Sequence, residues 1–254
     1  SEYGSGGVIY YYNGSEWNPE SSPTTSTIYD IKIISQTDIW AVGNDIYHFN
    51  GVSWSVAYET NTCYSIDVVS ATDIYVGSIN GIIYHYDGSA WTFTTANAGH
   101  IKDIQMDASD SGWALASDGE ILYYNGFGWS LQHDIERSSC TTISVSSTSD
   151  IWVGSAQQFD GVTKLGHWDG SEWLVVLNGY GRKINSMRAL SGSDIWFIGS
   201  NPYYGDSGTN ISHWNGTSLQ EITSPTSNTL YDIYMMSETD GWAVGGDGVV
   251  LRYH

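Results

Sequence analysis

A short aromatic motif recurs along the whole chain, and this repetition constrains the fold more than any other feature. In its fullest form the motif reads Asp-Ile-Trp-Ala-Val-Gly, at residues 38–43. Six copies, about 40 residues apart, place an aromatic side chain at Trp40, Tyr75, Trp113, Trp152, Trp196 and Trp242. Self-similarity at this period is typical of propellers and other repeat architectures.

Each repeat has the same order of four short segments rich in Ile, Val, Tyr and Trp, which we name a, b, c and d. The third and fourth segments are separated by Asn-Gly or Asp-Gly pairs, at Asn13-Gly14, Asn50-Gly51, Asp87-Gly88, Asn125-Gly126, Asp169-Gly170 and Asn215-Gly216. Such pairs predict hairpins because both residues tolerate positive φ. No window has a sustained helical period. We therefore predict an all-β fold, a β-propeller of four-stranded antiparallel blades.

The number of blades follows from counting segments. Strand a occurs six times, but strand c occurs seven times, because residues 8–12 and residues 249–253 both match it. The main prediction is one domain over residues 1–254 with six blades, in which N-terminal strands at about 8–24 join the C-terminal repeat 230–254 and close the ring. Two alternatives remain, a seventh partial blade and a surplus strand that pairs with a neighbouring molecule.

The repeat resembles a known group of propellers. The pattern Asp-Ile-Trp-Ala-Val-Gly, followed by His-Tyr-Asp-Gly-x-x-Trp as at residues 85–91, is similar to the tectonin and Asp-box-related propellers. These include lectins and photosystem II assembly factors. The resemblance covers essentially the whole chain and implies the propeller fold. The Asp-box itself is only approximated, at residues 86–91, and the resemblance carries over no catalytic residue.

The charge of the chain excludes several classes of function. Eight Lys and Arg residues stand against 28 Asp and Glu residues, which gives a formal net charge of -20. Such a chain repels phosphate backbones, so we expect no nucleic-acid partner. No apolar run reaches the length that spans a bilayer, so we expect no membrane insertion. An acidic, Lys-poor surface suits a secreted or cell-surface protein.

The Trp, His and Cys residues are explained by the scaffold. All 12 Trp residues fall on repeat positions of strands b, c or d. Four His residues share one strand-c position, which predicts a repeated hydrogen bond rather than a metal site. Cys63 and Cys140 take an apolar position of strand a in different blades, so we predict buried free thiols and no disulfide. No cofactor is expected, and calcium stays a weak option because no Asp-x-Asp-x-Asp-Gly loop occurs.

Departures from the repeat point to a candidate binding site. The b–c loops are long in the fourth and fifth repeats, and the intervening d–a loop leaves on the same face of a propeller. Polar and aromatic side chains of the types that bind glycans gather there. The candidate ligand-binding residues are Gln158, Phe159, Asp160, Tyr180, Arg182, Asn201, Tyr203, Tyr204 and Asp206.

These features favour a non-enzymatic binding module, secreted or displayed on a surface, that recognises a glycan or a protein surface through loops on one propeller face. Hydrolase elbows, phosphate loops and zinc-protease motifs are absent from the sequence, so we predict no catalytic residues. Two alternatives come from other classes. One is a structural subunit of an extracellular assembly or filament, self-associated through exchanged terminal strands, and the other is a glycoside hydrolase or lyase.

Overall fold

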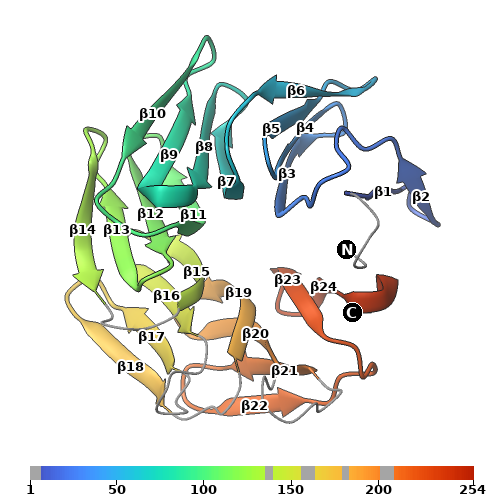
Figure 1. Cartoon of the computed structure of the whole chain (residues 1–254). Coiled ribbons are helices and arrows are strands. Elements are labelled where there is room, and N and C mark those ends of the chain that lie inside the picture. The colour runs from blue at the N-terminus through green and yellow to red at the C-terminus, as the bar shows by residue number, and fades with distance from the viewer. Residues whose placement is uncertain (1–6, 135–139, 156–163, 179–182, 201–208) are drawn as a thin grey trace.

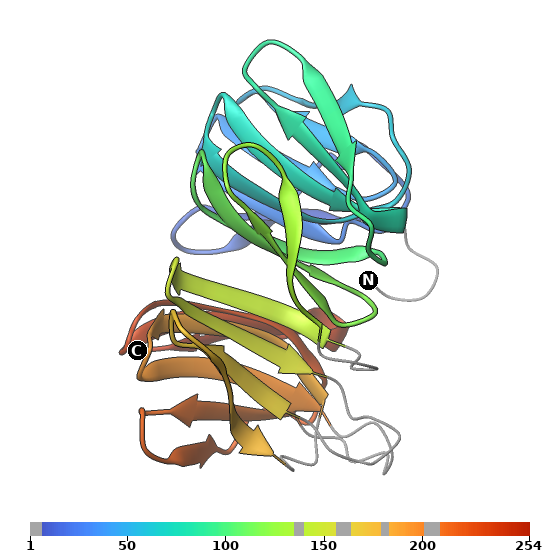
Figure 2. The ribbon, with the colours of Figure 1, turned by 90° about the vertical axis from the view of Figure 1, so that its left-hand side faces the viewer.

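A computed structural model describes residues 7–134, 140–155, 164–178, 183–200 and 209–254. Antiparallel sheets stand in a ring around a central axis, with strand a of each blade innermost (Figure 1). Seen from the side, the blades of the first and second halves of the chain form the two halves of the ring (Figure 2). The predicted all-β, six-bladed propeller is confirmed.

The first three blades each have four strands in the order a–b–c–d. The first blade is β3 (Asp30–Ser35), β4 (Asp38–Val42), β5 (Ile46–Phe49) and β6 (Trp54–Tyr58). The second is β7 (Cys63–Ser70), β8 (Asp73–Ser78), β9 (Ile82–Tyr86) and β10 (Trp91–Thr95), with a 3-10 turn, η1 (Ile79–Gly81), between b and c. The third is β11 (Ile101–Ala108), β12 (Ser111–Ala116), β13 (Glu120–Tyr124) and β14 (Trp129–Asp134).

The fourth and fifth blades also have four strands, whereas the sixth has three. The fourth is β15 (Cys140–Ser147), β16 (Asp150–Ser155), β17 (Lys164–Trp168) and β18 (Trp173–Asn178). The fifth is β19 (Lys183–Ser191), β20 (Asp194–Ser200), β21 (Thr209–Trp214) and β22 (Leu219–Ile222). The sixth is β23 (Leu230–Ser237), β24 (Asp240–Gly245), the 3-10 turn η2 (Gly246–Gly248) and β25 (Val250–Tyr253).

The predicted Asn-Gly and Asp-Gly turns connect c to d, but the two residues work differently from the expectation. Only the glycine has positive φ, as at Gly88, where φ is 87°. The Asp or Asn acts through its side chain: Asp87 Oδ1 accepts the backbone N–H groups of Ser89 at 2.8 Å and Ala90 at 2.9 Å. Positive φ therefore favours glycine at one position, and the other position needs a short side-chain acceptor.

The cores lie between blades, because strand b of one blade packs on strand a of the next. In the first of these cores, Val42 of β4 packs with Cys63 and Ile66 of β7, and all three side chains are fully buried. Trp40, Trp113, Trp152 and Trp196 are buried in such cores, as their scaffold role predicted. Cys63 and Cys140 are buried and free, at the predicted apolar position.

Side chains on strand a also join each blade to the next one around the axis. Each accepts a backbone N–H from strand a of the following blade, and we call these bonds latches. They are Asp30 with Ile66 at 3.0 Å, Asp67 with Met106 at 2.7 Å, Asp103 with Ile143 at 2.9 Å, Gln105 with Val145 at 2.9 Å, Ser144 with Ala189 at 2.9 Å, and Ser186 with Ile233 at 3.3 Å. Five successive junctions are latched in this way.

The N-terminal strands do not complete the last blade, which corrects the expected closure. Strands β1 (Ile9–Tyr12) and β2 (Trp17–Glu20) pair with each other, while β23, β24 and β25 form a separate three-stranded sheet. The hairpin contacts the last blade through side chains: Tyr12 and Trp17 lie 5.9 Å and 6.4 Å from Trp242, between ring centroids. Trp40 contacts Tyr86 and Trp91 of the second blade in the same way. The hairpin therefore contacts Trp242 of the sixth blade as the c–d hairpin of a following blade would. It does not supply strand c of the sixth blade itself, because β25 already occupies that position.

Candidate functional site

Two positions of strand a point toward the axis in every blade and form two tiers of side chains. Relative to the buried apolar residue that begins the strand-a pattern, such as Cys63 or Ile101, they lie two and four residues later. The first tier is Asp30, Ser65, Asp103, Thr142, Ser186 and Asp232, and the second is Lys32, Asp67, Gln105, Ser144, Arg188 and Tyr234. Side chains two residues apart share one face of a strand, so both tiers line the same wall.

The tiers enclose a cavity of about 730 Å³ on the axis, and all of their members except Ser65 and Ser144 line it. The wall carries four carboxylates and two basic groups. Lys32 Nζ lies 3.2 Å from Asp67 Oδ1, and this ion pair joins the first and second blades. A cavity of this size suits a small ligand, and its polar wall favours one that makes hydrogen bonds.

Burial changes the acidity of the carboxylates in the first tier. Burial raises the pKa of Asp30 to about 6, although Lys32 and the backbone N–H groups of Ile66 and Ile31 lower it. Burial likewise raises the pKa of Asp103 to about 7, against the N–H of Ile143. Burial lowers the pKa of Lys32, but the carboxylates of Asp67, Asp30 and Asp103 outweigh it and raise that pKa to about 12. Near neutral pH, Lys32 is therefore charged while Asp103 and Asp30 are close to titration.

The fifth and sixth blades give their part of the wall a different character. The guanidinium of Arg188 lies over the ring of Tyr234, with its carbon 5.1 Å from the ring centroid. Arg188 Nε is buried and has no hydrogen-bond partner among the described residues. A buried N–H without a partner is costly, so Arg188 Nε is an unsatisfied donor in this part of the wall.

All nine residues predicted to bind a ligand lie outside the described residues: Gln158, Phe159, Asp160, Tyr180, Arg182, Asn201, Tyr203, Tyr204 and Asp206. The described strand ends that bracket them can be placed. Lys164 pairs with Asn178 in the fourth blade, and Ser200 pairs with both Lys183 and Thr209 in the fifth. The three segments therefore leave their blades from the same end of the strands.

The predicted histidine position forms a repeated scaffold cluster. His48, His85, His167 and His213 bond the first Asp of strand b through Nε2 at 2.7–2.9 Å. Each ring also stacks on the strand-b aromatic, as His167 does on Trp152 with 4.1 Å between centroids. No group of three or more His, Cys, Asp or Glu side chains in the described part of the chain could hold a metal ion.

The sequence reasoning missed the two tiers, although the repeat contains the signal. Aligned on their apolar residue, the six strand-a segments carry polar or charged side chains at almost every tier position. Strand a is the innermost strand of a blade, so this column of polar residues indicates an axial site. The loop insertions of the fourth and fifth repeats are the more visible departure from the repeat, because they change its length.

The comparisons with known proteins define the class by fold. No family model matches the chain, and no curated protein matches it. The extracellular domain of a protein described as a hybrid two-component system of B. thetaiotaomicron superposes with a TM-score of 0.71 and 16% identity, covering 96% of this chain and 35% of that one. The chain thus spans about a third of the length of that domain.

Two other solved structures superpose over most of their own length. YCF48 from Cyanidioschyzon merolae gives a TM-score of 0.68 and 16% identity, covering 95% of this chain and 86% of that one. The computationally designed Ika8 protein gives 0.68 and 10%, covering 98% and 91%. Identities this low support the fold alone. Among the described residues, no helix is long and apolar enough to cross a membrane.

Proposed function

We propose that the protein is a non-enzymatic binding module, secreted or held at a cell surface, that recognises a glycan on one face of the propeller, with the axial cavity as the anchor of the site. The cavity carries this proposal. Its wall combines carboxylates, an amide, hydroxyl groups and a guanidinium, and these groups hydrogen-bond to sugar hydroxyls. Side chains of the two tiers point toward the axis from six blades, so a ligand on the axis is held from several sides.

The long loops of the fourth and fifth repeats extend this site in the proposal. Their anchoring strand ends share one end of neighbouring blades, and their sequences supply the aromatic rings that stack on sugars. The ligand is then a chain of sugars, with one residue at the axis and others along the face. A protein surface is the alternative ligand for the same loops.

The proposed location rests on charge and on one structural neighbour. The net charge of -20 with only eight basic residues is typical of proteins that resist non-specific association outside cells. One neighbour is the extracellular domain of a bacterial signalling protein. We also propose that the repeat is related to the tectonin and Asp-box-related propellers, on the strength of the motif at residues 85–91.

A glycan array followed by calorimetry with the best ligand tests the proposed function. Arg188→Gln removes the guanidinium from the cavity, and Tyr203→Ala/Tyr204→Ala removes two rings from a loop. We expect each variant to weaken binding by about tenfold or more, which corresponds to about 1.4 kcal/mol.

Phe127→Ala is the matched control, because Phe127 is 98% exposed in a c–d turn at the opposite end of the strands. This variant should bind like the unchanged protein. An array without a hit, or a ligand whose affinity neither test variant changes, contradicts the proposal. Turnover of a polysaccharide that a single Asp→Asn change in the cavity abolishes would show an enzyme instead.

A further inference from the structure

The fourth blade lacks a side chain at a position of strand c that the other blades fill. In the second blade Tyr84 lies opposite Val76 of strand b, and its side chain is only 7% exposed. In the fourth blade the residue opposite Val153, the equivalent of Val76, is Gly166. The equivalent residues of the other blades are Tyr47, Leu122, Ser212 and Leu251.

Neither the backbone nor the space around Gly166 requires a glycine. Its φ is not positive, and a Cβ added there would meet no atom closer than 3.9 Å. The fifth blade balances its small Ser212 with a fully buried Phe197 on strand b, whereas the fourth blade has only Val153 there. A glycine inside a strand often marks a place where a ligand comes close.

The absence of this side chain leaves a cavity of about 120 Å³ between the third and fourth blades, which we call the lateral cavity. Its lining matches the surroundings of Tyr84 position by position. His133 takes the place of Tyr58, since each pairs with the residue of strand c that precedes this position. The places of Trp91 and Phe93 are taken by Trp173 and Val175.

The aromatic wall has nearly the same geometry in both blades. Tyr58 stacks on Trp91 with 5.8 Å between ring centroids and 25° between planes. His133 stacks on Trp173 with 5.3 Å and 18°. In the second blade the ring of Tyr84 lies edge-on to Tyr58 at 5.8 Å. The lateral cavity therefore keeps the wall against which a phenol ring packs in the second blade, without that ring.

The polar groups of the lateral cavity are few and suit a hydroxyl on the ring. Ser155 Oγ is occupied by the backbone of Lys164, accepting its N–H at 2.9 Å and donating to its C=O at 3.3 Å. His133 and Lys164 add an imidazole and an ammonium to the lining, and both groups hydrogen-bond to a phenol oxygen. A mostly apolar pocket with a few polar groups is typical of small-molecule sites.

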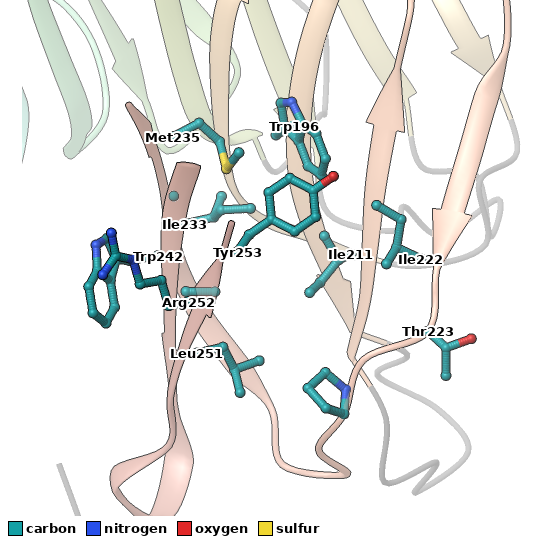
Figure 3. A pocket seen from close by; sticks show the side chains of 13 residues that line it. Trp196, Ile211, Ile222, Thr223, Ile233, Met235, Trp242, Leu251, Arg252 and Tyr253 are labelled. Atoms are coloured by element: carbon teal, nitrogen blue, oxygen red, sulfur yellow. The ribbon is translucent and has the colours of Figure 1, made fainter. Parts of the chain in front are cut away.

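The cavity between the fifth and sixth blades, shown in Figure 3, has a different origin. Its lining includes Leu251, the equivalent of Gly166, so the side chain of this position is present there. That cavity borders β25, beside which no strand d lies among the described strands. The lateral cavity instead lies in a blade whose four strands are all present, and it follows from a single glycine.

We propose that the lateral cavity binds a phenol ring, either of a small free phenolic compound or of a tyrosine side chain on a peptide. The ring takes the place that Tyr84 holds in the second blade and packs against His133 and Trp173. The size is suitable, because an apolar cavity of about 150 Å³ in another protein holds one benzene molecule.

A titration of 4-fluorophenol with the full chain, followed by fluorine NMR, tests this site. The fluorine signal should shift or broaden saturably. Unlabelled p-cresol, which has the side-chain structure of tyrosine, should displace the probe. Cyclohexanol carries a hydroxyl on a non-planar ring and should compete about tenfold more weakly, because it lacks the aromatic contacts.

Gly166→Tyr supplies the ring from the chain itself and should weaken binding of the probe by at least about tenfold. Gly166→Leu, with the residue type of Leu122, is a second such variant should the first lose its fold. Gly128→Tyr is the matched control, because it makes the same substitution at a turn glycine whose added Cβ would meet nothing within 4 Å. This control should bind the probe like the unchanged protein.

Three results overturn the proposal: no saturable binding, equal competition by p-cresol and cyclohexanol, or unchanged binding by a folded variant of Gly166. N-acetyltyrosinamide separates the two sources of the ring. Competition equal to that of p-cresol supports a tyrosine side chain, and competition by p-cresol alone supports a free phenolic compound. The lateral and axial cavities share no lining residue, so failure of either proposal leaves the other standing.

Discussion

The junction between the last blade and the first differs from the five latched junctions, although the same repeat builds its two sides. Ile66 of the second blade is fully buried against the first blade, whereas the equivalent Ile31 of the first blade is 42% exposed. On the other side, Val42 is fully buried and the equivalent Val244 is 40% exposed. Strands β23 and β3 do not pack together as other neighbouring a strands do.

The difference shows that the repeat encodes a surface for its neighbour rather than a self-sufficient blade. A residue at one repeat position is core only where the next blade is present to cover it. Repeat proteins owe much of their stability to such nearest-neighbour interfaces. At the sixth junction Asp232 accepts the N–H of Ile233 in its own strand, and Ile31 donates to Asp30 in its own strand. The Asp232 carboxylate and the Ile31 N–H therefore do not form the latch that joins strand a of neighbouring blades at the other five junctions.

The largest expected effect comes from truncating the same repeat position on the two kinds of junction. Ile66→Ala removes three carbon atoms from a closed core and should lower the free energy of unfolding by about 2–5 kcal/mol. Ile31→Ala removes the same atoms from a partly exposed position and should lower the free energy of unfolding by less than about 1 kcal/mol. Urea unfolding followed by tryptophan fluorescence measures both.

Equal losses of unfolding free energy in Ile66→Ala and Ile31→Ala would contradict the difference between the two junctions, because Ile31 would then be covered in solution. The slope of the urea transition serves as the control, since an unchanged slope shows that both variants unfold the same amount of surface.

A smaller effect is expected from titration of the latch carboxylates. Burial raises the folded-state pKa of Asp30 to about 6 and of Asp103 to about 7, above the unfolded value near 4. The folded protein therefore holds more protons than the unfolded chain between about pH 4 and 7. Its free energy of unfolding should fall as the pH rises through this window, by on the order of 1–4 kcal/mol, and change little from these groups above it.

Urea unfolding at intervals from pH 4 to pH 8 checks this direction. Asp103→Asn should flatten the upper part of the decline. Asp87 and Asp169 act oppositely, because hydrogen bonds in their turns lower their pKa to about 2, but their window lies below about pH 4. Stability that rises between pH 4 and 7, or an unchanged profile in Asp103→Asn, would contradict buried latch carboxylates.

Much of the fold could be predicted from the sequence because the same local pattern recurs in every repeat. The turn glycines and the strand-b aromatics were assigned correctly, since both depend on neighbours within one or two segments. The closure could not be read, because strands 8–12 and 249–253 carry the same c-type pattern. Which of them occupies the last blade depends on tertiary packing that the pattern does not contain.

The candidate site was also only partly predictable from the sequence. Loops that depart from the repeat are visible as insertions, yet their conformation depends on contacts that no repeat specifies. The axial tiers are encoded as plainly as the core, but their meaning appears only once strand a is known to be innermost. Lys32 and Asp67 illustrate this, because they are 35 residues apart in sequence and pair only across two adjacent blades.

The smallest expected effect comes from the turn glycines of a complete blade and of the N-terminal hairpin. Gly88 and Gly14 both have positive φ, 87° and 98°, so alanine strains either turn by about 1–2 kcal/mol. At Gly88 a new Cβ would also lie 2.7 Å from Thr72 Cβ, whereas at Gly14 it would meet nothing within 4 Å. Gly88→Ala should therefore destabilise the protein more than Gly14→Ala, as measured by thermal unfolding. Strain in a loosely attached hairpin is relieved by local opening without unfolding the ring. If Gly14→Ala were the more destabilising variant, the hairpin of β1 and β2 would therefore have to unfold together with the blades.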